Sequence, residues 1–209
     1  MEILGRLFGS EAKTKIIRLF LFNPEAVYNA RDISSRTNIK GRQIRTALKS
    51  LVKMGLIRKK SASKETKSTK KVKQKTRKIK EIVYFLDQKF PYADTLSNLM
   101  FVASIKADDR LAARIMPAGK IKLIIASGIF TRQNDARLDL LIVGDDINED
   151  KLARIIGSLE TDIGRDLTYS SLTITDFNYR LDLHDRLIRD VIDFDHIVLT
   201  DKIGFQRRK

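Results

Sequence analysis

Residues 128–144, with the sequence GIFTRQNDARLDLLIVG, bring together side chains that could do phosphate or metal-ion chemistry. Gly128 lies at a turn whose backbone N–H groups could cradle a phosphate, and Asp139 lies on the strand expected to follow. Alternate residues of a strand point to the same face, so a second carboxylate at position 137 would complete a divalent-metal site. The chain has Arg137 there, and its guanidinium is expected to pair with Asp139 and to repel a cation. We therefore predict no catalytic residue and no metal ion here. We instead interpret this stretch as the remnant of an anion-binding site, made of Gly128, Arg132, Arg137 and Asp139.

The rest of the chain offers few side chains for catalysis or metal binding. It has no cysteine and only two histidines, His184 and His196, whose separation matches no metal-binding spacing. The strand expected within residues 167–175, where a third acid would serve a metal site, carries none. We expect no cofactor.

Positive charge is concentrated in one segment. The formal net charge is +15 over 209 residues, and residues 58–80 hold twelve of the Lys and Arg residues with a single acid, Glu65. Such a block indicates a polyanionic partner, nucleic acid first and an anionic membrane surface second, while a solvated linker is the plainer interpretation. No apolar run approaches the about 20 residues of a membrane span, and the N-terminal residues lack the pattern of a signal peptide. We expect a cytoplasmic protein without a membrane partner.

Residues 10–86 show the order helix, helix, turn, helix, hairpin. Ser10 can cap a first helix, which Asn23-Pro24 ends, and Asn29 can cap a second, short helix over residues 30–37. The third helix is expected over residues 41–54 and ends at Gly55. Two strands are expected at 56–60 and 79–87, and the basic block lies between them.

The third helix combines one apolar stripe with one cationic face. Its apolar residues recur at the spacing of a single buried face; they are Ile44, Ala47, Leu48, Leu51 and Val52. The opposite face contains no acid. Arginine suits guanine and glutamine suits adenine through paired hydrogen bonds. We predict contacts with base edges or nearby phosphates from Arg42, Gln43, Arg45 and Thr46, and contacts with phosphates from Lys49 and Lys53.

Residues 28–60, YNARDISSRTNIKGRQIRTALKSLVKMGLIRKK, resemble the winged helix-turn-helix transcriptional regulators. The residues that fall at this family's core and helix-stop positions are Ala30, Ile33, Ile39, Ile44, Leu48, Leu51, Gly55 and Leu56. The resemblance implies a DNA-binding domain over residues 1–88, with residues 58–80 as a long basic wing. The wing residues expected to contact DNA are Lys59, Lys60, Lys70, Lys71, Lys73, Lys75, Arg77 and Lys78.

A helical connector is expected over residues 89–119, and from Lys120 the apolar pattern alternates between strands and helices. Strands are predicted at 120–127, 137–145, 166–175 and 196–200. Helices are predicted at 148–164 and 175–194. This order indicates a small α/β domain with a mostly buried sheet.

Residues 124–147 and the closing stretch 175–199 resemble the minimal nucleotidyltransferase fold. The whole chain resembles bacterial proteins that join a winged helix to such a domain and are often labelled transcriptional regulators. Active members of the superfamily carry a Gly-Ser turn and an Asp-x-Asp strand, whereas this chain has Gly128-Ile129 and Arg137-Leu138-Asp139. The resemblance implies an α+β protein whose domain over residues 120–209 is nucleotidyltransferase-like and not an enzyme.

We therefore predict sequence-specific binding of double-stranded DNA by a transcriptional regulator. The second domain would serve dimerisation, or sensing of a nucleotide or a protein effector. A homodimer would present two recognition helices to half-sites one DNA turn apart. Two alternatives stay open: an active nucleotidyltransferase of the kind that accompanies toxins, and RNA binding through the basic segment.

Overall fold

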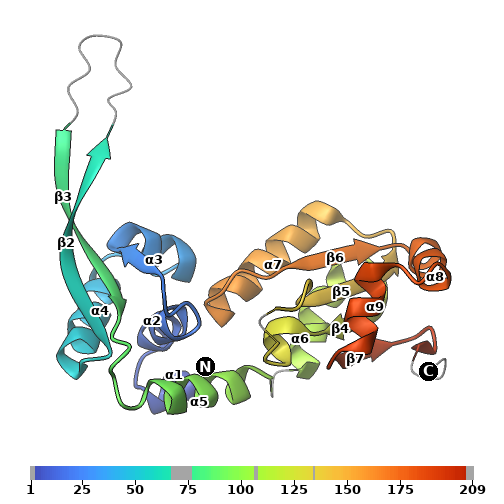
Figure 1. Cartoon of the computed structure of the whole chain (residues 1–209), viewed down its shortest axis with the longest axis horizontal. Coiled ribbons are helices and arrows are strands. Elements are labelled where there is room, and N and C mark those ends of the chain that lie inside the picture. Colours follow the sequence, from blue (N-terminus) through green and yellow to red (C-terminus); the bar gives the residue numbers. More distant parts are fainter. Residues whose placement is uncertain (1–2, 67–76, 106–107, 134, 206–209) are drawn as a thin grey trace, which may run out of the picture. The chain divides into compact units, whose positions relative to one another are not determined.

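A computed structural model of the chain describes residues 3–66, 77–105, 108–133 and 135–205. These residues form a mixed α+β structure with two separate sheets (Figure 1), which confirms the predicted fold class at that level. In this part of the chain no helix is long and apolar enough to cross a membrane.

The chain divides into two compact units. Unit 1 contains Met1–Met100 and Thr161–Arg165, and unit 2 contains Phe101–Glu160 and Asp166–Lys209. The connector expected over residues 89–119 is therefore divided between the units, and the division falls inside helix α5 (Ala93–Ile105).

Unit 1 consists of helices and a three-stranded antiparallel sheet of order β1-β3-β2. Its helices are α1 (Ile3–Leu7), α2 (Glu11–Leu21), α3 (Ala30–Thr37) and α4 (Arg42–Met54). Its strands are β1 (Val27–Asn29), β2 (Ile57–Thr66) and β3 (Arg77–Leu86). The three predicted helices and the hairpin are confirmed, whereas α1 and β1 were not predicted.

Local hydrogen bonds fix the turn between α3 and α4. The Asn29 side chain caps α3 by accepting from the amides of Arg31 and Asp32, and the Asp32 carboxylate in return accepts from the amide of Asn29. Asn38 ends the helix in the left-handed conformation, with φ of 53°, which asparagine tolerates better than most residues. The Ser34 hydroxyl donates to the carbonyl of Ile39 at 2.7 Å. These contacts set the direction in which α4 begins.

The apolar stripe of α4 faces the core of unit 1, as predicted. Ile44, Leu48 and Leu51 are buried, as are Phe20 of α2 and Ile33 of α3. Because these side chains recur every three or four residues, they lie on one side of α4, and their burial leaves the opposite side of the helix in solvent. The core therefore decides which residues of the helix are exposed.

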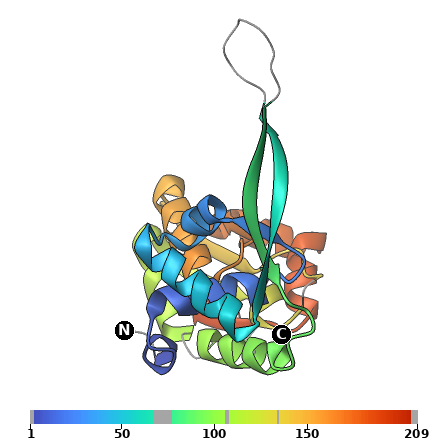
Figure 2. The ribbon, with the colours of Figure 1, turned by 90° about the vertical axis from the view of Figure 1, so that its left-hand side faces the viewer.

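The hairpin β2–β3 is anchored at its base and extends beyond the helices of unit 1 (Figures 1 and 2). Ile57 and Leu86 face each other across the two strands and are both buried. On the side of β3 away from β2, Tyr28 of β1 lies opposite Tyr84 of β3. The rings of Tyr28 and Phe20 meet edge to face, with their centres 5.7 Å apart. Apolar contacts thus hold the base, and the distal strands lie outside the core.

Unit 2 is built on a four-stranded sheet of order β6-β5-β4-β7, in which only β5 and β6 run parallel. Its strands are β4 (Lys120–Ala126), β5 (Leu140–Asp145), β6 (Tyr169–Leu172) and β7 (Ile197–Asp201). Its helices are α6 (Asp108–Ile115), α7 (Glu149–Ile163) up to Glu160, α8 (Ile174–Asp182) and α9 (Arg186–Asp193), with short 3₁₀ turns at Met116–Ala118 and Gly128–Phe130.

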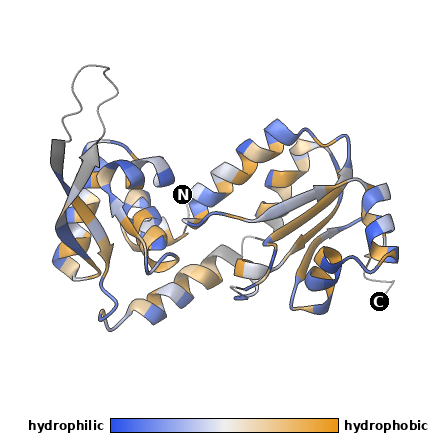
Figure 3. Ribbon diagram, turned by 45° about the horizontal axis from the view of Figure 1, so that its top comes forward, coloured by the Kyte–Doolittle hydropathy of each residue, from blue (hydrophilic) through white to orange (hydrophobic). Residues whose placement is uncertain are grey.

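The two central strands of this sheet, β4 and β5, are mainly apolar and buried, whereas the residues of β6 and β7 are only partly buried (Figure 3). One face packs under α8 and α9, through residues such as Leu141, Phe177 and Val191. The single helix predicted over residues 175–194 is wrong, because the chain breaks at His184, whose φ is 54°, and Asp185 caps a new helix. The strand predicted from residue 137 begins only at Leu140.

The burial of the α4 stripe can be tested by truncating one of its side chains. Leu51→Ala removes a fully buried side chain and should lower the free energy of unfolding of unit 1 by about 2–5 kcal/mol. Lys49→Ala, two positions away on the exposed face, should change it little. Urea unfolding followed by far-ultraviolet circular dichroism measures both. Equal effects of the two substitutions would contradict the orientation of α4.

Candidate nucleic-acid interface

The exposed face of α4 carries every residue predicted for it. The residues that are solvent-exposed on this helix include Arg42, Gln43, Arg45, Thr46, Lys49 and Lys53. Among the residues that the structure describes, none of the four cations of this set forms an ion pair. The positive charge of this face is therefore available to a partner.

The N-terminal end of α4 adds a favourable position for an anion. Gly41 precedes the helix with φ of 59° and provides no side-chain hydrogen bond to its first turn. The N–H groups of a helix's first turn have no intrahelical partners and carry partial positive charge. Arg42 and Gln43 occupy this turn, so their side chains and the backbone donors lie at the same end of the helix.

The two faces of the hairpin β2–β3 differ in how their cations are engaged. On one face, Arg58 pairs with Asp87 at 2.7 Å, and the Lys60 ammonium lies over the Phe85 ring at 5.3 Å from its centre. These contacts hold both cations against the protein itself. Both remain exposed, so they can still approach a polyanion, but with less freedom than an unengaged lysine.

The opposite face of the hairpin carries exposed cations around an apolar side chain. It continues the face that buries Ile57 and Leu86 at the base, because alternate strand residues point the same way. Farther out it presents Lys59, Lys80 and Ile82, and Ile82 is 52% exposed. In the described part of the chain neither lysine forms an ion pair.

The other predicted wing residues are only partly covered by the structure. Lys70, Lys71, Lys73 and Lys75 lie outside the described residues. Arg77 and Lys78 begin β3, where their backbones lie opposite those of Thr66 and Glu65 in the β2–β3 register. Lys80 was not among the predicted contacts, although the alternation of β3 would have placed it on the same face as Lys59.

Asp139 is buried and serves the backbone of its own unit. Its side chain accepts hydrogen bonds from the amide of Ile129 at 2.9 Å and from the amide of Thr168 at 2.8 Å. The Ser127 hydroxyl donates to the carbonyl of Leu138 at 2.7 Å in the same loop. The carboxylate thus occupies an amide of the glycine turn, where a phosphate cradle would need a free donor.

Gly128 allows this close approach. Its φ of 56° is unfavourable for other residues, and a Cβ here would lie 2.9 Å from the Leu138 carbonyl oxygen. A larger residue would displace the turn from Asp139. The glycine therefore serves the internal hydrogen bonds of this loop.

The two arginines of the proposed remnant do not converge on Asp139. Arg137 forms an ion pair with Asp190 of α9, so the expected pairing with Asp139 is wrong. The Arg132 guanidinium lies over the ring of Phe101, 4.4 Å from its centre. The structure thus brings together Gly128 and Asp139 but directs both guanidinium groups to other partners.

Acidic residues beyond β5 are also engaged locally. Lys120 pairs with Asp146 at 2.7 Å, and this hydrogen bond with the attraction between the charges lowers the pKa of Asp146 and raises the pKa of Lys120. Both side chains are largely exposed, so the pair contributes little to stability. Within the described residues no group of three His, Cys, Asp or Glu side chains could hold a metal ion.

Comparisons of the chain with protein-family models, with curated proteins and with solved structures found no match. Any function must therefore be inferred from the residues and their geometry.

The internal role of Asp139 leads to a prediction about stability. Asp139→Ala removes the acceptor of two backbone N–H groups in a buried loop and should lower the free energy of unfolding of unit 2 by about 2–5 kcal/mol. Asp135→Ala, at an exposed position of the preceding loop, is the matched control and should change it little. Thermal and urea unfolding measure the difference. An Asp139→Ala protein as stable as the control would contradict the structural role.

Proposed function

We propose that unit 1 binds double-stranded DNA as a winged helix-turn-helix domain and that the protein is a sequence-specific transcriptional regulator. The observation that carries this proposal is the exposed, acid-free face of α4 with its unpaired cations. Solvated helix faces usually mix charges of both signs. A face of one sign, beside a strongly basic hairpin, favours a polyanionic partner.

The dimensions of α4 support recognition in the major groove. The helix has 13 residues, or about 20 Å, and the major groove of B-DNA, about 12 Å wide, admits one α-helix. Recognition helices read bases with the residues near their N-terminal end. In this chain those residues are Arg42 and Gln43, and both can form paired hydrogen bonds with a purine.

We expect the hairpin to contribute to the affinity for DNA more than to the discrimination between base sequences. The described strands pair from Ile57–Leu86 to Thr66–Arg77, which at about 3.4 Å per residue gives a length of about 30 Å. This length is close to one turn of DNA, about 34 Å. The hairpin can therefore follow the phosphate backbone beyond the groove that α4 would occupy, and the exposed Ile82 could pack against sugars of a minor groove.

For residues 120–209 we propose a nucleotidyltransferase-like domain without catalysis, which serves dimerisation or sensing of an effector. The support for the absence of catalysis is that only Asp139 remains of the Asp-x-Asp pair, since position 137 is an arginine, and that its carboxylate is committed to two backbone amides. Labelled ATP and Mg²⁺ provide the counter-test, since transfer of a nucleotide that depends on Asp139 would overturn this part of the proposal.

Salt dependence tests the role of the hairpin. Each phosphate contact contributes about −0.9 to the slope of log K against log[salt]. Lys59→Ala with Lys80→Ala should therefore make the slope less negative by about 2 and weaken binding to all duplexes equally. Fluorescence anisotropy with labelled duplexes between 50 and 200 mM salt measures this.

The matched control removes the same charge from unit 2. Arg186→Ala with Lys202→Ala, both at exposed positions, should leave the slope nearly unchanged. Equal effects of the two double variants, or the absence of duplex binding at low salt, would count against the hairpin as a DNA contact. Stronger competition by a structured RNA than by duplex DNA would assign the interface to RNA.

Base preference tests the role of α4. Arg42→Ala and Gln43→Ala should each relax the preference at one or two base pairs, by about 1–3 kcal/mol of discrimination. Lys53→Ala, at the other end of the same face, should weaken binding without altering the preference. Selection of bound duplexes from a random-sequence library, followed by sequencing, reports all three. An unchanged preference in both Arg42→Ala and Gln43→Ala would refute base reading by this turn.

A further inference from the structure

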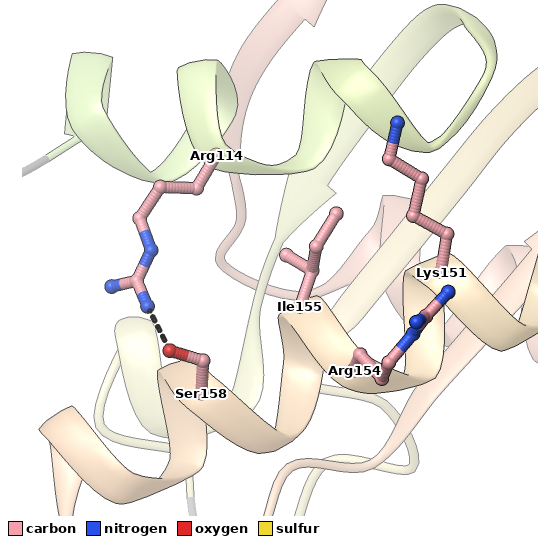
Figure 4. A pocket seen from close by; sticks show the side chains of 5 residues that line it. All are labelled: Arg114, Lys151, Arg154, Ile155 and Ser158. Atoms are coloured by element: carbon pink, nitrogen blue, oxygen red, sulfur yellow. Dashed lines mark hydrogen bonds between the residues drawn. The ribbon is translucent and has the colours of Figure 1, made fainter.

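Unit 2 contains a basic pocket between α6 and α7 that the proposed DNA interface does not use (Figure 4). It has a volume of about 250 Å³ and is lined by Arg114, Lys151, Arg154, Ile155 and Ser158. Arg114 comes from the last turn of α6, and the other residues come from α7. The Ile155 side chain lies between Arg114 and Lys151 and forms an apolar wall.

The electrostatics of the pocket favour an anion. Its lining contains three cations and no acid. In the part of the chain that the structure describes, neither Lys151 nor Arg154 forms an ion pair. Glu149, at the start of α7, is engaged by the hydroxyl of Ser171 at 2.8 Å. The positive charge of the pocket is thus not balanced by its own lining.

Hydrogen bonds orient two of the polar groups. Arg114 Nη2 donates to Ser158 Oγ at 2.9 Å, and Arg154 Nε donates to the carbonyl of Asp150 at 3.1 Å. A serine hydroxyl that accepts one hydrogen bond still has its own proton to donate. Ser158 can therefore donate to an anion held between Arg114 and Lys151, while Arg154 is steadied by its own helix.

We propose that this pocket binds the phosphate group of a small phosphorylated molecule. Planar guanidinium groups, an ammonium and a hydroxyl are all donors from which phosphate oxygens accept hydrogen bonds. The volume of about 250 Å³ accommodates a phosphate with a small organic group beside Ile155. Full-sized ligand pockets begin at about 300 Å³, so the ligand is small. The assignment does not depend on DNA binding by unit 1.

Titration of the full-length chain with inorganic phosphate tests the proposal, with two-dimensional ¹H–¹⁵N NMR as the readout. Saturable shifts are expected at the amides of Ile155 and Ser158, and sodium chloride at equal ionic strength should not reproduce them. Lys151→Ala with Arg154→Ala should weaken phosphate binding at least tenfold. Alanine favours helices, so this variant should keep α7 intact.

Two further variants separate a built site from general charge. Ser158→Ala leaves the net charge unchanged and should weaken binding several-fold, while Arg186→Ala with Lys202→Ala removes the same two charges elsewhere and should have no effect. The proposal is overturned if phosphate shifts only amides of unit 1, or if the control weakens binding as much as the pocket variant. It is also overturned if the pocket variant loses duplex DNA affinity beyond the control, because the pocket would then contact the DNA backbone. Loss of the phosphate site with intact DNA binding would leave the function proposed for unit 1 untouched.

Discussion

The burial of one apolar stripe on α4 is the interaction on which the proposed interface depends. Because the burial of Ile44, Leu48 and Leu51 fixes the rotation of the helix about its axis, the opposite face is held in solvent in one orientation. The exposed cations of that face form no ion pair with the described residues. An exposed face of this kind costs stability and is understandable if a polyanion neutralises it.

In unit 2, by contrast, the charged side chains around the Gly128 turn contact other groups of the fold. Asp139 accepts hydrogen bonds from two backbone amides, Arg137 pairs with Asp190, and the Arg132 guanidinium lies over an aromatic ring. Each of these three side chains therefore has a partner within the fold. The cations around the α6–α7 pocket differ, since the described residues leave Lys151 and Arg154 without an ion pair.

Local sequence signals predicted most elements, and tertiary contacts account for the differences. The α4 stripe and the Asn29 cap act within a few residues, so their consequences are visible in the sequence. Strand β1 spans only three residues and is held by its pairing with the edge of β3, a contact that no local sequence pattern predicts. The partner of Arg137 lies far along the chain on α9, and the position of that helix depends on a break at His184. Likewise, the residues that line the basic pocket come from both α6 and α7, so no single sequence motif predicts the pocket.

The most direct test of the central claim is lysine footprinting with and without duplex DNA. Acetylation under limiting reagent, read by mass spectrometry, reports the accessibility of each lysine in the full chain. At low salt, duplex DNA should protect Lys49, Lys53 and Lys59 while Lys202 keeps its reactivity. Unchanged acetylation of Lys49 and Lys53, or equal protection of Lys202, would contradict a DNA interface on the exposed face of α4.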